Sequence, residues 1–221
     1  MSISHPAFES LARDFERNIV FQHMHPYELF RKWLEAVWAF LDAANQPVAY
    51  KTCLDAYTFE QGREFGRMFG LYTDLVEALP FHDILGSLFM RLDVKSAAAG
   101  QYFSPFGIAE MMAKMQFDKD PFLALVREKG TVSIYDPAVG SGVMLLAFAK
   151  TVFSELGLEG LKHLQLYGTD IDRRCVLMCR IQLRMNGLDE VGRMARLTTG
   201  TPAPAQAPGQ MMLALTDGKA A

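Results

Sequence analysis

A short strand-like segment, a glycine-rich turn and a helix-like segment follow one another directly between residues 131 and 156, and this order constrains the fold most. Residues 131–135 are rich in β-branched and aromatic side chains, which is typical of a buried strand. Residues 136–142 read Asp-Pro-Ala-Val-Gly-Ser-Gly, and a helical pattern follows at 143–156. The same alternation continues downstream, with a strand at 164–167, a helix at 174–186 and a third strand at 194–198. Strands that alternate with helices of this length predict a parallel α/β sheet.

The first 95 residues have a different character, because they are helical throughout. Three helices are predicted there, at 27–43, 59–79 and 83–92. Pro26 fits the first turn of the first helix, where its missing N–H costs nothing. On the second helix Gly62, Gly66 and Gly70 lie four residues apart, and each costs up to ~1 kcal/mol relative to alanine. We therefore expect a close contact with another helix at these glycines, within an N-terminal helical bundle.

The chain divides into three parts by composition: a helical domain at 1–95, an α/β core at 96–200 and a Pro/Ala-rich tail at 201–221. Within the core, Ser104 and Pro105 predict the N-cap and first turn of a helix at 106–115. Asp120 and Pro121 predict the same for a helix at 122–128, which ends at Gly130. The tail contains one more candidate strand, at 211–215.

The overall composition excludes several classes of protein. The chain has 221 residues, of which 50% are hydrophobic and 21% charged, with a net charge of −3. This is a globular composition without the uniform positive charge of a nonspecific nucleic-acid binder. Three cysteines without zinc spacing indicate a reducing compartment. Because no apolar run reaches the ~18 residues of a membrane span and no secretory signal is visible, we expect a cytoplasmic protein with no membrane partner.

The glycine-rich segment 136–142 is the strongest candidate site. Backbone N–H groups of such a turn, together with the start of the helix behind it, favour an anionic ligand group. Asp136 follows the first strand, at the edge where open α/β sheets bind their ligands. The segment is not a nucleotide P-loop, because Lys does not follow the second glycine. A tight turn without any ligand is the alternative interpretation.

A second signal, Tyr-Gly-Thr-Asp-Ile-Asp at 167–172, ends the next strand. An acidic residue there can accept hydrogen bonds from both hydroxyls of a ribose. We assign Asp170 to the ribose and Asp172 to the N-cap of the following helix, with the reverse assignment left open. Arg173, Arg180 and Arg184 share one face of that helix and form either a phosphate-facing patch or an ordinary solvated face.

Taken together, four segments resemble the adenine-specific N6 DNA methyltransferases, and most closely the modification (methylase) subunit of type I restriction systems. They are Asp-Ile-Leu-Gly at 83–86, Gly-Gln-Tyr-Phe-Ser-Pro at 100–105, and the segments 136–142 and 167–172. The resemblance runs from about residue 80 to 200. It implies a Rossmann-like, S-adenosylmethionine-dependent methyltransferase sheet, present here in part. It also implies the cofactor-binding residues Tyr102, Phe103, Ser104, Pro105, Asp136, Pro137, Gly140, Ser141 and Gly142, with Asp170 on the ribose.

The chain departs from this family at the catalytic motif. No Asn/Asp-Pro-Pro-Tyr/Phe tetrapeptide, which would hold the amine of a flipped adenine, occurs in the 221 residues. Residues 199–201, Thr-Gly-Thr, stand where the family has the acid or amide that contacts the cofactor's adenine. Three interpretations follow: a DNA adenine methyltransferase completed by a partner chain, an inactive cofactor- or partner-binding regulator, and a methyltransferase for RNA or small molecules.

The partners expected are DNA and either a second copy or another subunit. A partial sheet would leave the strand at 131–135 near an open edge, and exposed edges favour pairing with another chain.

Overall fold

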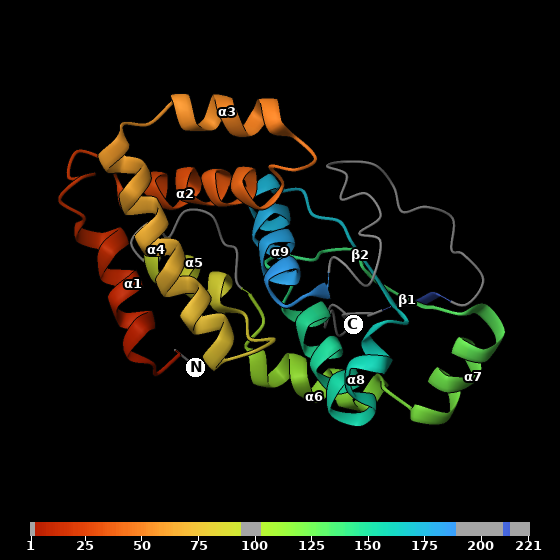
Figure 1. The fold of residues 1–221 in the computed structure, drawn as a ribbon. Coiled ribbons are helices and arrows are strands. Elements are labelled where there is room, and N and C mark those ends of the chain that lie inside the picture. The colour runs from red at the N-terminus through yellow and green to blue at the C-terminus, as the bar shows by residue number, and fades with distance from the viewer. Residues whose placement is uncertain (1–2, 94–102, 189–209, 213–221) are drawn as a thin grey trace.

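The computed structural model describes residues 3–93, 103–188 and 210–212 (Figure 1). The first part is helical, with α1 (Pro6–Arg17), α2 (Pro26–Leu41), α3 (Pro47–Asp55), α4 (Phe59–Ala78) and α5 (Ile84–Asp93). The second part contains α6 (Phe106–Gln116), α7 (Lys119–Lys129), β1 (Val132–Asp136), α8 (Val143–Leu161), β2 (Leu164–Gly168), α9 (Arg173–Met185) and β3 (Gln210–Met212). The protein is therefore mostly helical, with a small sheet.

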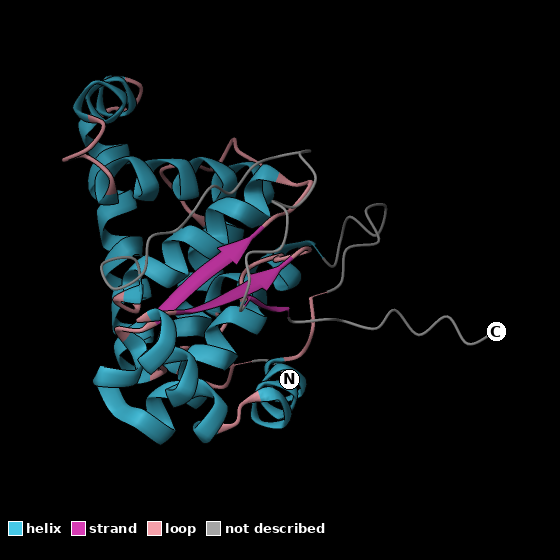
Figure 2. Ribbon diagram, turned by 90° about the vertical axis from the view of Figure 1, so that its right-hand side faces the viewer, coloured by secondary structure: helices cyan, strands magenta, loops and turns pink. Residues whose placement is uncertain are grey.

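The sheet has three strands in the described residues, in the order β2-β1-β3, and both pairings are parallel (Figure 2). The register of β1 with β2 runs from Val132 opposite Leu164 to Asp136 opposite Gly168. The strands expected at 131–135 and 164–167 are confirmed, and part of the one at 211–215 is present as β3. The strand expected at 194–198 lies outside the described residues.

The expectation that the first strand lies near an open edge is wrong for the described sheet. β1 is its central strand, because β3 pairs with the side of β1 that β2 leaves open. This pairing joins segments more than 70 residues apart, and no local pattern predicts it. As a result, both edges of β1 are paired within the chain itself.

Several helix ends lie where local signals place them, and two do not. Pro26 occupies the first position of α2, Gly130 ends α7 with φ 75°, and the Asp172 side chain caps α9. The helix α6 begins at Phe106, as predicted, but the N-cap assigned to Ser104 is wrong: Pro105 is the N-cap, and no side chain caps the helix.

The predicted N-cap Asp120 is also wrong, because α7 begins before it. Asp118 is the N-cap, and its side chain accepts a hydrogen bond from the Asp120 N–H. Two acids separated by one residue both fit a helix start, and the earlier one is used. Asp120 then lies in the first turn, where its negative charge interacts favourably with the helix dipole.

The close helix contact expected at Gly62, Gly66 and Gly70 is wrong. All three are exposed, and a Cβ added at any of them meets no atom within 4 Å. Instead, α4 buries a different face of its own, which contains Phe65, Met68, Tyr72, Leu75 and Val76. Helices α1 and α3 were not predicted individually, and α3 has no buried residue.

Two hydrophobic cores meet at α9. Met178 and Ile181 belong to the core of the helical part, together with Trp33 and Phe30. Cys179 and Leu183, on the other side of the same helix, belong to the core around α8 and the sheet. Helix α9 therefore lies at the junction of the two cores. No helix in the described ranges is both long and apolar enough to span a membrane.

Candidate functional site

The loop between β1 and α8 is held in a fixed shape by its backbone. Val139 N–H donates to the Thr169 carbonyl over 2.8 Å, and Thr169 N–H donates to the Asp136 carbonyl over 3.0 Å. Gly140 and Gly142 have φ values of 53° and 98°, in the left-handed region that favours glycine. Gly142 is also the N-cap of α8, and no side chain caps that helix. The loop thus presents an uncapped helix start at the carboxyl edge of the sheet.

Close contacts on two sides crowd the positions of Gly140 and Gly142 in this loop. A Cβ at Gly142 would lie 2.9 Å from the Cys179 sulfur on α9. A Cβ at Gly140 would lie 3.1 Å from the ring of Phe103. The structure therefore places Phe103 against the loop, while the cofactor role that the resemblance implies for these residues stays a prediction.

Asp170 lies next to the same loop. Its Oδ2 accepts a hydrogen bond from Gly140 N–H at 2.9 Å, and its Oδ1 accepts one from Asp172 N–H at 2.8 Å. The side chain is half-buried, whereas the neighbouring Ile171 is 89% exposed. Asp172 caps α9 by accepting from Arg174 N–H at 2.8 Å, which confirms the role assigned to it. The ribose role of Asp170 stays a prediction.

Asp136 is the most buried carboxylate of the loop, with an exposed fraction of 1%. It accepts a hydrogen bond from Ala138 N–H at 2.9 Å. Burial, with a smaller contribution from the negative charge of Asp170, raises the pKa of Asp136 to about 6. Asp136 therefore carries a charge that the protein stabilises poorly, and a positively charged ligand group nearby would relieve this cost.

A buried polar network lies behind the loop and joins it to α5 and α9. Ser141 Oγ donates to Asp83 Oδ2 at 2.7 Å. Gln182 Nε2 donates to Asp83 Oδ1 and to the Ser141 carbonyl, both at 2.8 Å. Gly86 N–H donates to Asp83 Oδ1 at 3.0 Å. Burial raises the pKa of Asp83, and the three hydrogen bonds oppose that shift. The Ser141 hydroxyl is hydrogen-bonded to Asp83, so any contact of this residue with a ligand would involve its backbone atoms.

An aromatic cluster from the helical part extends to the same place. The ring of Phe89 on α5 lies 5.4 Å from that of Phe103 and 5.8 Å from that of Tyr27 on α2. The Arg174 guanidinium lies 4.9 Å from the Tyr27 ring centre and 5.7 Å from that of Phe89, and it is paired with Asp172. Tyr27 and Phe89 have no sequence motif around them, and only the fold shows their position.

The remaining predicted site residues are placed as follows. Pro105 and Pro137 are exposed, and Ser104 is half-exposed beside Phe103. Tyr102 lies outside the described residues. The residues that the structure brings into contact are thus Phe103, Gly140 and Asp170.

The parallel sheet, its glycine loop and the adjacent acid define an α/β protein with a candidate ligand site at the carboxyl edge of the sheet. The family model described as N-6 DNA Methylase matches residues 81–206, which is more than half of the chain. The chain belongs to this family, and the resemblance predicted from its motifs is confirmed.

Similar proteins include the methylase subunit of the type I restriction enzyme MpnII from Mycoplasma pneumoniae, 29% identical over 109 residues. The match covers 49% of this chain and 17% of that subunit, so the chain spans less than a fifth of the length of this relative. Among solved structures, a protein of Listeria monocytogenes described as a class I S-adenosylmethionine-dependent methyltransferase has a TM-score of 0.44 at 12% identity, over 86% of this chain and 52% of that one. A type I restriction-modification methyltransferase subunit from Streptococcus thermophilus has a TM-score of 0.41 at 19% identity, over 90% and 49%.

Proposed function

We propose that the chain binds S-adenosylmethionine at the loop 136–142 and Asp170, as the cofactor-binding part of a DNA adenine N6-methyltransferase of the restriction-modification type. The observation that carries this proposal is the 2.9 Å hydrogen bond between Gly140 N–H and the Asp170 carboxylate. It joins the two segments that the motifs assign to the cofactor, at the carboxyl ends of neighbouring parallel strands. Membership of the N-6 DNA Methylase family supports the same interpretation.

The residues present suit the chemical groups of this cofactor. The uncapped start of α8 favours a carboxylate, such as the one at the cofactor's methionine end. The buried Asp136 favours a positive charge, and the half-buried Asp170 carries a carboxylate, which accepts hydrogen bonds of the kind that ribose hydroxyls donate. Ile171, 89% exposed beside Asp170, offers an apolar surface for the adenine ring. When bound, the cofactor supplies an electrophilic methyl group.

A second candidate function is a regulator that binds cofactor or a partner subunit without transferring a methyl group. The observation that favours it is the sequence itself, in which no Asn/Asp-Pro-Pro-Tyr/Phe tetrapeptide occurs among the 221 residues. Under both candidate functions, the binding of DNA, the binding of a further subunit and a cytoplasmic location remain predictions. The two candidates share the cofactor site, so one binding experiment tests their common basis.

Isothermal titration of the 221-residue protein with S-adenosylmethionine is that experiment. We expect Asp170→Ala to weaken binding by about 1.5–3 kcal/mol, the range for hydrogen bonds to a charged group, or roughly 10- to 150-fold. Asp55→Ala, at the exposed end of α3, is the matched control and should bind as the wild type does. Absence of both binding heat and thermal stabilisation at millimolar cofactor would contradict the proposal.

A further inference from the structure

Helix α5 and the loop 136–142 are joined through one carboxylate, that of Asp83, which directly precedes the helix. Its Oδ1 accepts hydrogen bonds from Gly86 N–H at 3.0 Å and from Gln182 Nε2 at 2.8 Å. The bond from Gly86, three residues further on, is that of a helix N-cap. Its Oδ2 faces the loop and accepts from the Ser141 hydroxyl at 2.7 Å. Capping therefore accounts for the position of Oδ1 but not for the contact of Oδ2 with the loop.

A carboxylate is a costly choice at this position. Asp83 is 5% exposed, its three donors are neutral groups, and burial raises the pKa of its carboxyl. Serine or asparagine caps a helix about as well as aspartate does, without a buried charge. Gly86 is constrained too, because a Cβ there would lie 2.2 Å from Asp83 Oδ2 and 2.4 Å from Ser141 Oγ. The chain thus keeps both a buried carboxylate and a helical glycine where α5 meets the loop.

On the loop side, the contact is made by the one side chain between Gly140 and Gly142. Because glycine has no side chain to restrict its backbone, a turn of this kind has other conformations open to it. Ser141 is completely buried, and its bond to Asp83 restricts the turn from inside the protein. The same turn carries the Gly140 N–H that donates to Asp170, and it ends at the uncapped start of α8. The Asp83 contact and the candidate site therefore share three residues.

We propose that Asp83 is a positioning residue, which through Ser141 holds the turn 140–142 in the shape that binds S-adenosylmethionine. This inference rests on the proposed function, because it concerns the same loop. Asp83 does not contact the ligand itself, since it lies buried behind Ser141. Its effect is to fix the backbone that does. The helical part, to which Asp83 and α5 belong, thereby sets the affinity of the loop.

Two substitutions at Asp83 separate this role from capping. Asp83→Asn retains a carbonyl oxygen in the place of Oδ1 and offers an amide to the Ser141 hydroxyl, which can accept as well as donate. Asp83→Ser can still cap α5 but has no second group that reaches Ser141. From the loop side, Ser141→Ala combined with Asp83→Asn breaks the same contact without leaving a buried charge. Positioning predicts that Asp83→Asn alone behaves like the wild type and that the other two variants do not.

The first measurement needs no ligand, because the amide signals of Gly140 and Gly142 in magnetic resonance spectra of glycine-labelled protein report the shape of the turn. We expect Asp83→Ser to shift both signals and Asp83→Asn to leave them near their wild-type positions. Asp42→Ser is the matched control. Asp42 is also buried, at 8% exposed, and it accepts hydrogen bonds at 2.8 Å from two side-chain amides that follow it closely in the chain. This control should lower stability and move neither signal.

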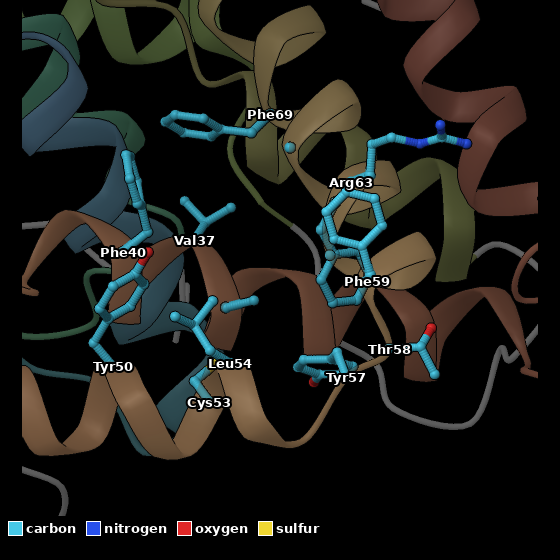
Figure 3. A pocket seen from close by; sticks show the side chains of 14 residues that line it. Val37, Phe40, Tyr50, Cys53, Leu54, Tyr57, Thr58, Phe59, Arg63 and Phe69 are labelled. Atoms are coloured by element: carbon cyan, nitrogen blue, oxygen red, sulfur yellow. The ribbon is translucent and has the colours of Figure 1, made fainter.

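The second measurement is titration with S-adenosylmethionine, at a temperature where circular dichroism shows every variant folded. We expect Asp83→Ser to weaken binding about fivefold, which is within the range for the loss of one hydrogen bond, and Asp83→Asn by less than about twofold. A further control concerns an apolar groove of about 560 Å³ between α2, α3 and α4, whose walls include Phe40, Leu54 and Phe69 (Figure 3). Leu54→Asp changes this groove and not the loop, so it should bind the cofactor as the wild type does.

The two measurements distinguish failure of this inference from failure of the proposed function. If the wild type binds no S-adenosylmethionine, the proposed function is wrong, and the glycine signals alone decide whether Asp83 holds the turn. Glycine signals that do not move in Asp83→Ser would overturn the positioning role, as would unchanged binding by that variant. Equal loss of binding in Asp83→Asn and Asp83→Ser would overturn it as well, because the effect would then belong to the charge and not to the contact with Ser141.

Discussion

At the scale of single residues, three carboxylates determine the candidate site, and their surroundings give them different roles. Asp83 is fully enclosed by hydrogen-bond donors from Ser141, Gln182 and Gly86. Asp136 is equally buried but accepts the Ala138 N–H, so its charge is less well compensated. Asp170 is half-buried, beside the exposed Ile171. Of the three, Asp170 is therefore the one that we expect to contact a ligand directly, and Asp136 is the one that we expect to be most sensitive to charge nearby.

The pKa of Asp136 predicts how stability depends on pH. Its value in the folded protein is about 6, above the ordinary 3.8, so the folded state holds a proton that the unfolded state loses first. The stability that this proton provides is complete below pH 3.8 and is lost as the pH rises through about 6. The shift corresponds to about 3 kcal/mol. We expect Asp136→Asn, which cannot ionise, to gain up to that amount relative to wild type between pH 4 and pH 8.

Denaturant unfolding of both proteins across this pH range measures the difference. Comparison at each pH cancels the titration of the other groups, because both proteins share them. Asp118→Asn, at the exposed N-cap of α7, provides a control without a buried carboxylate. A stability difference between Asp136→Asn and wild type that does not change from pH 4 to pH 8 would contradict the assignment.

At the scale of elements, the sequence predicted those features that depend on local signals. Residues close together in the sequence predicted the strands β1 and β2, the helix end at Gly130 and the N-cap at Asp172. The pairing of β3 with β1, the exposure of the glycines on α4 and the cluster of Tyr27 with Phe89 could not be predicted this way. Each depends on contacts between segments far apart in the chain, and hydrophobic periodicity does not specify which segments meet.

The same contrast applies to the candidate site. Motifs identified the loop 136–142, Phe103 and Asp170, and the structure brings these together. They did not indicate that the Ser141 hydroxyl turns inward to Asp83, 58 positions away in the chain. A serine between two glycines fits both a ligand contact and a buried hydrogen bond, and only the position of α5 distinguishes them.

Gln182 joins three elements, so its removal should be costly. Its amide donates to Asp83 and to the Ser141 carbonyl, and its oxygen accepts from Leu85 N–H at 3.0 Å. Gln182→Leu keeps the approximate volume but removes the partner of the Leu85 N–H and of the Ser141 carbonyl and one of the three donors to Asp83, at about 1–3 kcal/mol for each group left unpaired before relaxation. We expect urea unfolding to show a loss of about 2–4 kcal/mol. Gln22→Leu, at an exposed position, should change stability by less than ~0.5 kcal/mol, and a similarly small effect at Gln182 would refute the network's importance.

At the scale of the whole molecule, the helical part and the α/β part share the candidate site. Helix α9 supplies residues to both hydrophobic cores, and its first turn carries Arg174 against Tyr27 and Phe89. Phe89 in turn contacts Phe103, which lies against Gly140. Helices α2 and α5 of the helical part therefore form one wall beside the loop. We expect changes in the helical part to reach the candidate site through this chain of contacts.

The purified 221-residue protein should bind S-adenosylmethionine without methylating adenine in duplex DNA. Methyl transfer needs the target amine held next to the methyl group, and in this family a tetrapeptide absent from these 221 residues holds it. Incubation with radiolabelled cofactor and unmethylated plasmid, followed by nucleoside analysis, measures N6-methyladenine directly. An active adenine methyltransferase assayed on the same plasmid is the positive control. Incorporation that is present in the wild type and absent in Asp170→Ala would show that other residues of this chain position the amine.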